Sequence, residues 1–279
     1  MDKNLNIDSQ TVDDFGREWN RFQQDFNSKE LKAIYENYFS LFPFKSLPEK
    51  SQGFDMGCGS GRWSAFIAPK VAKLYCVDPS KAALKVAKKN LKYLENCIFE
   101  NASANNFSVQ ENSMDFGFSL GVLHHVPDTQ EALNFCVSKL KQDAPFLLYL
   151  YYNFDNRGLL FRSIWLISDF IREFISKLPF LLKKLTTDFL ALFIYLPLAR
   201  ISLAIEFLGI KVNSIPLSYY RNKSFYTMRT DSLDRFGTRL EKRFSKSEIK
   251  LMMKEAGLER IKFSDSEPYW VALGYKSGQ

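Results

Sequence analysis

The stretch Gly53-Phe54-Asp55-Met56-Gly57-Cys58-Gly59-Ser60-Gly61-Arg62-Trp63 decides the fold that we predict for the rest of the chain. Its apolar residues Phe54 and Met56 indicate the end of a buried strand, and residues 62–68 can open a helix. Three glycines at every second position lie between them, and glycine lets the backbone turn sharply and lets a ligand approach closely. Because a helix N-terminus adds unpaired N–H groups and a positive dipole end, this stretch predicts a site for a nucleotide-like cofactor.

The spacing of the glycines narrows the class of cofactor. A dinucleotide fingerprint has the pattern G-x-G-x-x-G, and counted from Gly57 its last glycine would fall on Arg62. A second signal follows on the next predicted strand, where the run from Leu74 to Val77 ends in Asp78. An acidic residue at such a strand end typically accepts hydrogen bonds from ribose hydroxyls. The alternative is that the glycines serve only a tight turn between strand and helix.

The pattern D-x-G-x-G-x-G that begins at Asp55 resembles motif I of the class I S-adenosylmethionine-dependent methyltransferases. The resemblance covers about residues 50–150 and 240–276, and it includes the stretch from Ser119 to Asp128. It implies S-adenosyl-L-methionine as the cofactor, with Asp55 and the glycines on its methionine half and Asp78 on its ribose. The residues that we expect to bind the cofactor are Asp55, Gly57, Cys58, Gly59, Gly61, Arg62, Trp63, Asp78, Pro79, Ser103, Ala104, Ser119, Leu120 and Gly121.

The segment around Ser103 departs from the pattern of this family. Related methyltransferases have an acidic residue there that receives the adenine amino group, and the backbone N–H of the next residue meets the ring. Ser103 holds the acidic position in this chain, and a hydroxyl can still accept one hydrogen bond. We therefore expect a weaker adenine contact from Ser103, followed by a backbone contact from Ala104.

Strands alternate with helices over residues 51–150, which predicts a parallel sheet with right-handed crossovers. The resemblance implies an α/β fold with a Rossmann-like, seven-stranded, mostly parallel sheet of order 3-2-1-4-5-7-6, helices on both faces and an all-helical insertion after strand 5. Ser245 and Glu248 form a capping box for a helix that precedes two closing strands. The predicted domains are a helical lid (1–48), a Rossmann-like domain that binds the cofactor (49–151 and 240–279), and a helical cap with an Arg/Tyr-rich substrate segment (152–239).

Aromatic residues recur at helical spacing near the N-terminus, at Phe15, Trp19, Phe22 and Phe26, in a helix that we expect to start at Thr11. This helix either packs on the core or forms a lid over the cofactor, as N-terminal helices of class I methyltransferases often do. The pattern favours neither interpretation. In the second one, Phe15 and Trp19 contact the substrate.

A long apolar segment over residues 152–225 interrupts the alternation. The run from Phe189 to Ile210 has the length of a transmembrane helix. However, Pro197, Arg200 and Glu206 lie inside it, and charges near the centre of a span cost about 2–3 kcal/mol each. We therefore expect an all-helical insertion that is either a cap over the acceptor or an element lying against a membrane surface, and not a span.

The stretch 219–239 is dense in tyrosine and arginine and is predicted to form a loop. Five arginines lie between positions 221 and 243, and the acidic residues near them in the sequence are Asp231, Asp234 and Glu241. Because an arginine fork matches a carboxylate or a phosphate, we predict an anionic group on the acceptor, bound by Arg229 first. Ion pairs with these acidic residues are the other use of the arginines, and we expect both uses, with at least one arginine left for the substrate. The candidate substrate-binding residues are Phe15, Trp19, Tyr152, Arg221, Tyr226, Arg229 and Arg235.

The chain has two histidines, His124 and His125, and they follow the predicted fourth strand. In methyl transfer the sulfonium carbon is already activated, so the protein mainly orients the reactants and excludes water. A base is needed only if the acceptor must lose a proton, and imidazole suits that role near neutral pH. We take His124, His125 and Tyr151 as the catalytic candidates; alternatively, the histidines brace a turn beside the cofactor.

The composition limits the remaining classes of function. The chain has 279 residues and a net charge of +7. Its 26 phenylalanines suggest an aromatic core or an apolar surface for a partner. The excess of basic residues favours anionic substrates or an anionic membrane surface, and we find neither a nucleic-acid-binding signature nor a metal-binding pattern. None of the four cysteines forms C-x-x-C, and the polar N-terminus has no signal-peptide pattern, so we expect a cytoplasmic protein, with contact at the inner face of the membrane left open.

We predict an S-adenosylmethionine-dependent methyltransferase that acts on a small-molecule or lipid-linked acceptor. The aromatic start, the insertion and the Arg/Tyr stretch resemble a bacterial subgroup whose substrates are poorly defined. Two other classes remain. One is a nucleotide-cofactor oxidoreductase, which the glycine spacing disfavours, and the other is a non-catalytic partner of another methyltransferase that binds the cofactor. The sequence does not predict the oligomeric state.

Overall fold

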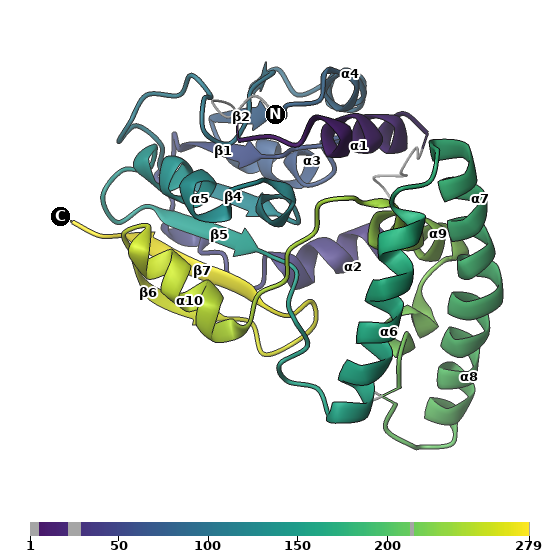
Figure 1. Cartoon of the computed structure of the whole chain (residues 1–279). Helices are drawn as coiled ribbons and strands as arrows, with labels where there is room; N and C mark the ends of the chain where they lie inside the picture. Colours follow the sequence, from purple (N-terminus) through teal and green to yellow (C-terminus); the bar gives the residue numbers. More distant parts are fainter. Residues whose placement is uncertain (1–5, 22–28, 213–214, 279) are drawn as a thin grey trace. The chain divides into compact units, whose positions relative to one another are not determined.

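The computed structural model describes residues 6–21, 29–212 and 215–278, and in the first of these ranges it describes the side chains of residues 6–17 (Figure 1). The chain forms two units. One comprises residues 1–153 and 240–279, and we call it the sheet unit. The other comprises residues 154–239, and we call it the helical unit.

The sheet unit is built on one seven-stranded sheet in the described part of the chain, with the order β3-β2-β1-β4-β5-β7-β6. Strands β1 to β5 are parallel, and β7 runs antiparallel to both β5 and β6. The predicted fold class and strand order are therefore confirmed. The strands are β1 (Gln52–Met56), β2 (Lys73–Val77), β3 (Cys97–Glu100), β4 (Phe116–Leu120), β5 (Pro145–Tyr149), β6 (Leu258–Phe263) and β7 (Val271–Lys276).

Helices cover both faces of this sheet. On one face α5 and α10 pack against Phe54 and Met56 of β1, and on the other face α2, α3 and α4 pack against Phe116 and Phe118 of β4. The helices of the sheet unit are α1 (Ser9–Arg21), α2 (Lys29–Tyr38), α3 (Ser64–Ile67), α4 (Lys81–Asn90), α5 (Thr129–Ser138) and α10 (Lys246–Glu255). Short 3₁₀ turns lie at η1 (Phe44–Ser46), η2 (Ala68–Lys70) and η3 (Leu123–His125).

The helix starts show where the sequence signals were right and wrong. The capping box of α10 is present as predicted, because the Ser245 hydroxyl accepts from the Glu248 N–H and the Glu248 carboxylate accepts from the Ser245 N–H. For α1 the expected start at Thr11 is wrong by two residues. The Asp8 carboxylate accepts the Thr11 N–H at 2.9 Å, so Asp8 caps a helix that begins at Ser9.

Aromatic rings and glycines pair reciprocally between β1 and β4 at the centre of the sheet. Gly53 is paired with Phe116, and Phe54 is paired with Gly117. A Cβ added to either glycine would collide with the phenylalanine ring of the other strand. Each ring therefore lies over a glycine of the neighbouring strand, and this explains part of the high phenylalanine content that the sequence shows.

The helical unit follows β5 as an insertion. It contains α6 (Leu159–Ile175), α7 (Phe180–Leu190), the π-helical turn η4 (Ala191–Tyr195), α8 (Leu196–Phe207), η5 (Ser218–Asn222) and α9 (Phe225–Gly237). Together α7, η4 and α8 form one helix over Phe180–Phe207, which in the described chain is long and apolar enough to cross a bilayer by length and composition. The turn η4 lies just before Pro197, whose missing N–H and bulky ring disturb the α-helical pattern four residues earlier.

The predicted loop over residues 219–239 is wrong, because most of this stretch is the helix α9. The Ser224 hydroxyl accepts the Thr227 N–H and caps the helix. Met228, Leu233 and Phe236 are buried on one face of α9, which packs against α6 and α7. Polar residues between these apolar positions hid the helical periodicity in the sequence.

The chain leaves the sheet unit and returns to it at one place. Tyr152 and Phe244 form an isolated parallel bridge. The Phe244 N–H donates to the Tyr151 carbonyl at 2.9 Å, and the Asn153 N–H donates to the Phe244 carbonyl at 3.0 Å. The two connections to the helical unit therefore start side by side.

Candidate functional site

The glycine loop after β1 has the sharply turned backbone that its sequence predicts. Gly57, Gly59 and Gly61 have φ angles of +78°, +54° and +80°, which L-residues with side chains rarely adopt. A Cβ at Gly57 would collide with Val122, which follows β4, and a Cβ at Gly61 would lie 2.7 Å from the Leu91 side chain. These contacts show that the glycines also serve the close packing of a tight turn, which was the alternative interpretation of the pattern.

The space beside the end of β4 is open. Gly121 also has a positive φ, of +78°, but a Cβ added there would meet no atom within 4 Å. The Gly121 N–H donates to the Tyr149 carbonyl at 3.0 Å, which fixes this residue between the ends of β4 and β5. A ligand can thus approach the backbone at Gly121, next to the glycine loop.

Asp78 lies at the end of β2 with its carboxylate against the glycine loop. The Gly59 N–H donates to one carboxylate oxygen at 2.9 Å, and the Ser80 N–H donates to the other at 2.8 Å. The side chain is buried, and burial raises the pKa of Asp78 to about 6 although both hydrogen bonds act in the opposite direction. The structure thus brings Asp78 and Gly59 together, as expected for two residues that share one ligand.

Asp55, on β1, provides a second carboxylate in this region. It is buried and accepts the Ser64 hydroxyl at 2.6 Å, which ties β1 to the first turn of α3. Burial raises the pKa of Asp55 to about 7. Its predicted contact with the methionine half of the cofactor stays a prediction.

The other predicted cofactor residues lie in the glycine loop or at and after the ends of β2, β3 and β4. The Arg62 guanidinium lies 4.6 Å from the centroid of the buried Trp63 ring. The Ser119 hydroxyl donates to the Met56 carbonyl at 3.0 Å, and the Pro79 carbonyl accepts from the Asn101 amide. Buried side chains are found at Cys58, Ala104, Ser119 and Leu120.

Ser103 is engaged in a local turn. Its N–H donates to the Asn106 side-chain oxygen at 2.8 Å, and its hydroxyl lies 2.6 Å from the Asn105 side-chain oxygen and 2.9 Å from the Asn106 side-chain oxygen. Because a hydroxyl has one proton to donate, Ser103 is already partnered within the turn. This favours the weaker adenine contact that the sequence suggests.

Helix α1 lies along the loops that follow β2 and β4. Gly16 packs so closely on α4 that a Cβ would lie 2.5 Å from the Ser80 hydroxyl. The Phe15 ring lies 5.0 Å from the His125 ring, and the Asn6 side chain exchanges two hydrogen bonds of 2.7 Å with the backbone of Asp128. The start of α1 thus lies beside the site; the side chain of Trp19 lies outside the described residues.

The two histidines have different hydrogen-bond partners and hence different tautomers. His125 Nδ1 lies 2.7 Å from the Leu240 carbonyl, so Nδ1 carries the proton and Nε2 has a lone pair. His124 Nδ1 accepts the Tyr151 N–H at 3.4 Å, so its proton is on Nε2. Both Nε2 atoms are buried without a hydrogen-bond partner in the described chain. The Nε2 atom of His125 is therefore a hydrogen-bond acceptor, whereas the Nε2 atom of His124 is a donor.

His124 is held neutral by its surroundings. Burial lowers the pKa of His124 well below its usual value, and the neighbouring His125 and Arg243 act in the same direction. Its ring stacks on Tyr151 with centroids 3.9 Å apart. The three predicted catalytic residues, His124, His125 and Tyr151, are thus in contact with one another.

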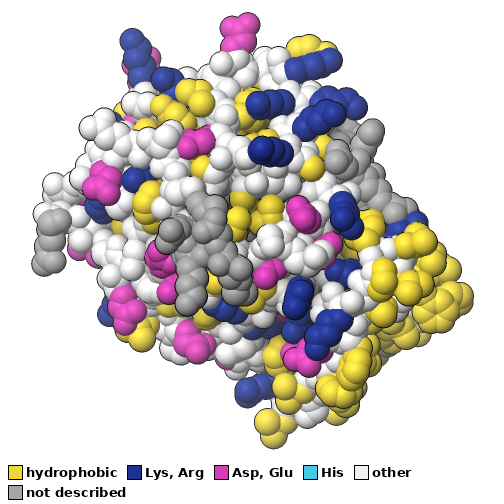
Figure 2. All heavy atoms as spheres, turned by 45° about the horizontal axis from the view of Figure 1, so that its top comes forward, with side chains coloured by type: hydrophobic (Ala, Val, Ile, Leu, Met, Phe, Trp, Pro, Cys, Tyr) yellow, Lys and Arg dark blue, Asp and Glu magenta, His cyan; other side chains and the backbone are white. Residues whose placement is uncertain are grey.

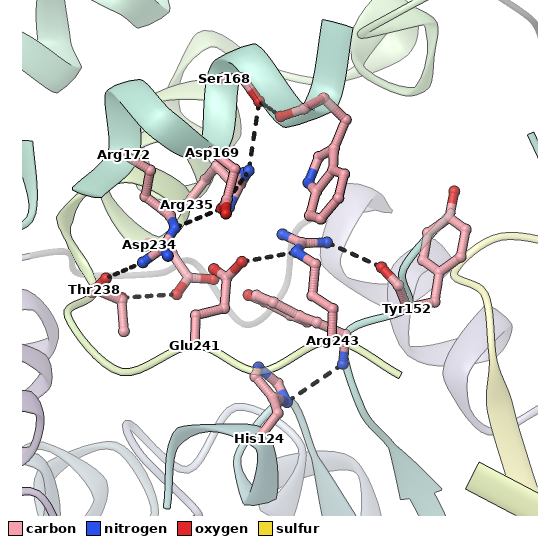
Figure 3. A network of polar contacts seen from close by, with 12 residues as sticks. His124, Tyr152, Ser168, Asp169, Arg172, Asp234, Arg235, Thr238, Glu241 and Arg243 are labelled. Atoms are coloured by element: carbon pink, nitrogen blue, oxygen red, sulfur yellow. Dashed lines mark hydrogen bonds and ion pairs between the residues drawn. The ribbon is translucent and has the colours of Figure 1, made fainter. Parts of the chain in front are cut away.

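Arg243 is a site residue that the sequence analysis did not select. Its guanidinium lies 5.1 Å from the centroid of the Tyr151 ring, donates to the Tyr152 carbonyl at 3.1 Å and pairs with the Glu241 carboxylate at 2.7 Å (Figure 3). The side chains of Arg243 and Glu241 are 11% and 1% exposed, so this ion pair is shielded from water. Arg243 lies one residue before Phe244, which forms the bridge to Tyr152. Because this bridge joins distant parts of the sequence, no local pattern indicated Arg243.

The arginines of the helical unit are paired with carboxylates of that unit. Arg229 makes a two-pronged contact with Asp188 at 2.9 and 3.0 Å, and Arg221 makes one with Glu206 at 2.8 Å for both contacts. Arg235 contacts Asp169, as Figure 3 shows. The expectation that only acidic residues nearby in the sequence neutralise these arginines is therefore wrong, because the partners come from α6, α7 and α8. Their role in substrate binding, like that of Tyr226 on α9, stays a prediction.

The sheet order, the glycine loop and the acidic residue at the end of β2 together define the sheet unit as a class I S-adenosylmethionine-dependent methyltransferase domain. Residues 54–148 match the family model described as a methyltransferase domain. The expected family is therefore confirmed, and its cofactor is S-adenosyl-L-methionine.

Individual relatives agree with this assignment. An uncharacterized methyltransferase of Bacillus subtilis, YcgJ, is 30% identical over 100 residues, and the match covers 35% of this chain and 40% of that protein. The chain thus spans less than half the length of the curated relative.

Two solved structures share the fold. A chain of the complex between the Haloferax volcanii Trm112 methyltransferase activator and a protein described as a methyltransferase is 11% identical, with a TM-score of 0.53, and the match covers 94% of this chain and 97% of that one. Haemonchus contortus phosphoethanolamine N-methyltransferase 2, in complex with phosphomonomethylethanolamine and S-adenosylhomocysteine, is 14% identical, with a TM-score of 0.50 and coverage of 92% of this chain and 44% of that one.

The residues at this edge of the sheet fit the cofactor of the family. Asp78 is a buried carboxylate with a lone pair left on each oxygen, which suits ribose hydroxyls. The open space at Gly121 allows a ligand to lie against the backbone at the end of β4. Asp78, the glycine loop and Gly121 would therefore hold the cofactor.

Proposed function

We propose that this protein is an enzyme that transfers a methyl group from S-adenosylmethionine to a small-molecule or lipid-linked acceptor. The observation that carries the proposal is the contact of the buried Asp78 carboxylate with Gly59, at two neighbouring strand ends of a methyltransferase domain. When bound, the cofactor supplies an electrophilic methyl group. The protein then needs to hold and orient the acceptor and to exclude water.

His125 is the residue that we propose as the general base for an acceptor that carries a proton. The Leu240 carbonyl holds the proton on Nδ1, so Nε2, which is buried without a hydrogen-bond partner among the described residues, has a lone pair that can accept a proton. His124 has the opposite tautomer, and its Nε2–H can donate a hydrogen bond to an acceptor atom. Since Phe15 packs on the His125 ring, we also propose that α1 moves away as a lid when the acceptor enters.

An anionic group on the acceptor remains part of the proposal. The helical unit has thirteen Lys or Arg residues and seven Asp or Glu residues, a net charge of +6 out of +7 for the whole chain. We also propose a cytoplasmic location, which is supported by the free thiols of all four cysteines.

Calorimetric titration of the full chain with S-adenosylmethionine, S-adenosylhomocysteine and NAD⁺ tests the choice of cofactor. We expect the first two to bind and NAD⁺ not to bind. Binding of NAD⁺ alone would support an oxidoreductase instead.

Transfer itself is tested by incubating the protein with methyl-labelled S-adenosylmethionine and either a polar or a lipid extract of bacterial cells. We expect label in one of the two extracts, and the extract identifies the acceptor class. Tight cofactor binding without transfer to either extract would support a non-catalytic partner of another methyltransferase.

A further inference from the structure

The helical unit exposes most of the large apolar side chains that the described chain leaves in contact with solvent. Of 23 such side chains, 20 lie in this unit and three lie in the sheet unit. Figure 2 shows hydrophobic side chains gathered at the right edge of the view, with basic side chains along their border. We call the following residues the apolar face: Leu160, Ile164, Ile167, Ile171 and Phe174 of α6, and Leu182, Leu185, Phe189, Phe193, Ile201 and Phe207 of the long helix.

Spacing shows that the apolar face of α6 is one continuous stripe. Its five members are separated by four, three, four and three residues, so they lie on one side of the helix. The opposite side of α6 has the polar groups. Arg172 is buried, and it contacts Asp169 at 2.8 Å and the Thr238 carbonyl at 3.2 Å (Figure 3). This helix therefore buries Arg172 on one side and exposes a stripe of apolar side chains on the other.

The long helix Phe180–Phe207 has the same arrangement. Lys183, Thr187 and Ser202 are buried on the side that faces the rest of the helical unit, although they are polar. Phe189 and Phe193 are 58% and 57% exposed. A helical unit designed for water would have the reverse distribution, because exposed apolar surface is unfavourable there. The outer side of this unit is therefore suited to an apolar environment.

Charge decides which apolar environment fits best. The helical unit has a net charge of +6, whereas the remaining residues have +1. Basic side chains lie at the ends of the helices that form the apolar face, with Arg162 in the first turn of α6, Lys177 just after its end and Lys211 after α8. Apolar side chains bordered by lysine and arginine match the boundary between acyl chains and anionic headgroups of a bilayer.

The charges of the long helix place it along the bilayer surface and not across it. Its longest stretch without a charge, Phe189–Ala199, has eleven residues, whereas a span needs about 20. The charges on either side have partners within the unit, since Asp188 pairs with Arg229 and the Arg200 guanidinium donates to the Arg221 carbonyl at 2.8 Å. One side of the helix faces protein along its whole length, which leaves the other side for lipid.

We propose that the apolar face of the helical unit is a docking surface for an anionic lipid bilayer, into which its aliphatic and aromatic side chains insert from one side. This inference does not require a lipid-linked acceptor, and its test measures binding alone. Its failure would leave the proposed methyl transfer untouched.

Vesicle cosedimentation of the full chain tests the proposal, with vesicles of phosphatidylcholine alone and of phosphatidylcholine mixed with phosphatidylglycerol. We expect binding to the mixed vesicles that weakens at high salt, because salt screens the attraction of the basic border. The affinity of the double variant Phe189→Ser/Phe193→Ser for the mixed vesicles should fall by about tenfold or more, because two large apolar side chains no longer insert. Leu251→Ser is the matched control, since Leu251 is 56% exposed on α10 of the sheet unit, and it should bind as the parent does.

The stability of the variants and the outcome of the vesicle assay together decide whether the proposal holds. The double variant should keep its melting temperature and its affinity for S-adenosylhomocysteine, so that a loss of binding reports on the surface. No binding to mixed vesicles, or an equal loss in the Leu251→Ser control, contradicts the proposal. A dimer in sedimentation velocity that the double variant disperses would assign the face to a second copy. Resistance of bound protein to alkaline carbonate extraction would instead indicate a span.

Discussion

At the scale of single residues, burial and hydrogen bonding set the protonation states that the site needs. The Asp78 carboxylate receives two backbone N–H groups and is nevertheless more basic than an exposed aspartate. Its ionised form is the better acceptor for ribose hydroxyls. Cofactor affinity should therefore depend on pH in a range where most carboxylates do not titrate.

We expect the parent protein to bind S-adenosylhomocysteine more weakly as the pH falls below about 6, the pKa of Asp78. Protonation removes a charge-assisted acceptor, so the Kd should rise by up to about tenfold for each pH unit below that value. Asp78→Asn should bind S-adenosylhomocysteine more weakly at every pH, by about 1.5–3 kcal/mol, and any pH dependence that it keeps should be centred near 7, the pKa of Asp55. Calorimetry between pH 5 and about 8 measures both effects, and an unchanged affinity in the variant would remove Asp78 from the cofactor site.

The histidine pair gives a second prediction at this scale. His125→Asn keeps a donor for the Leu240 carbonyl but removes the Nε2 lone pair. For an acceptor that must lose a proton, we expect the methyl-transfer rate to fall by about 10²–10⁴-fold while the affinity for S-adenosylhomocysteine stays the same. His124→Asn is the comparison, and if its rate falls by more than that of His125→Asn, the assigned roles are reversed.

At the scale of elements, α9 is held in the helical unit by ion pairs that reach other helices. Arg229 joins α9 to Asp188 of α7, and the side chains are 30% and 27% exposed. Arg229→Lys keeps the charge but loses the fork, so we expect a loss of stability of about 1 kcal/mol or less at this partly exposed site.

The melting temperature of Arg229→Lys, compared with that of Asp188→Asn and of the double variant, measures this pairing. The two single effects should not add in the double variant, because each removes the same contact. A raised KM for the acceptor at unchanged stability would instead support the role of Arg229 in substrate binding.

The contrast between the sheet unit and α9 shows which elements the sequence could predict. The strand order was implied by the family resemblance, which rests on the glycine loop, on Asp78 only 19 residues after Gly59, and on the alternation of strands and helices. The burial of α9 depends on α6 and α7, and the partner of Arg229 lies 41 residues away. Likewise, the tautomer of His125 is set by a carbonyl 115 residues later, which no local pattern contains.

At the scale of the whole molecule, the two connections of the helical unit begin beside each other at the Tyr152–Phe244 bridge. A short Gly-Ser linker can therefore replace residues 154–239 without stretching the sheet unit. Since both large hydrophobic clusters of the sheet unit exclude the helical unit, we expect the shortened chain to fold and to bind S-adenosylhomocysteine.

We further expect this shortened chain to lose methyl transfer, because the predicted cap for the acceptor is gone. Calorimetry and the labelled-transfer assay measure the two properties separately. Full turnover without residues 154–239 would show that the helical unit is not needed to hold the acceptor.

The position of β7 also sets the order in which the protein can fold while the ribosome is still making it. β5 ends at Tyr149, but its antiparallel neighbour starts at Val271, so one edge of β5 stays unpaired until the intervening chain has been made. At about 5–20 residues per second this wait is roughly 6–24 s. During that time the whole helical unit, including its apolar face, is synthesised before β7 can pair with β5. If the proposed docking on a bilayer begins at this stage, the apolar helices are covered by lipid while the edge of β5 is still open to other chains.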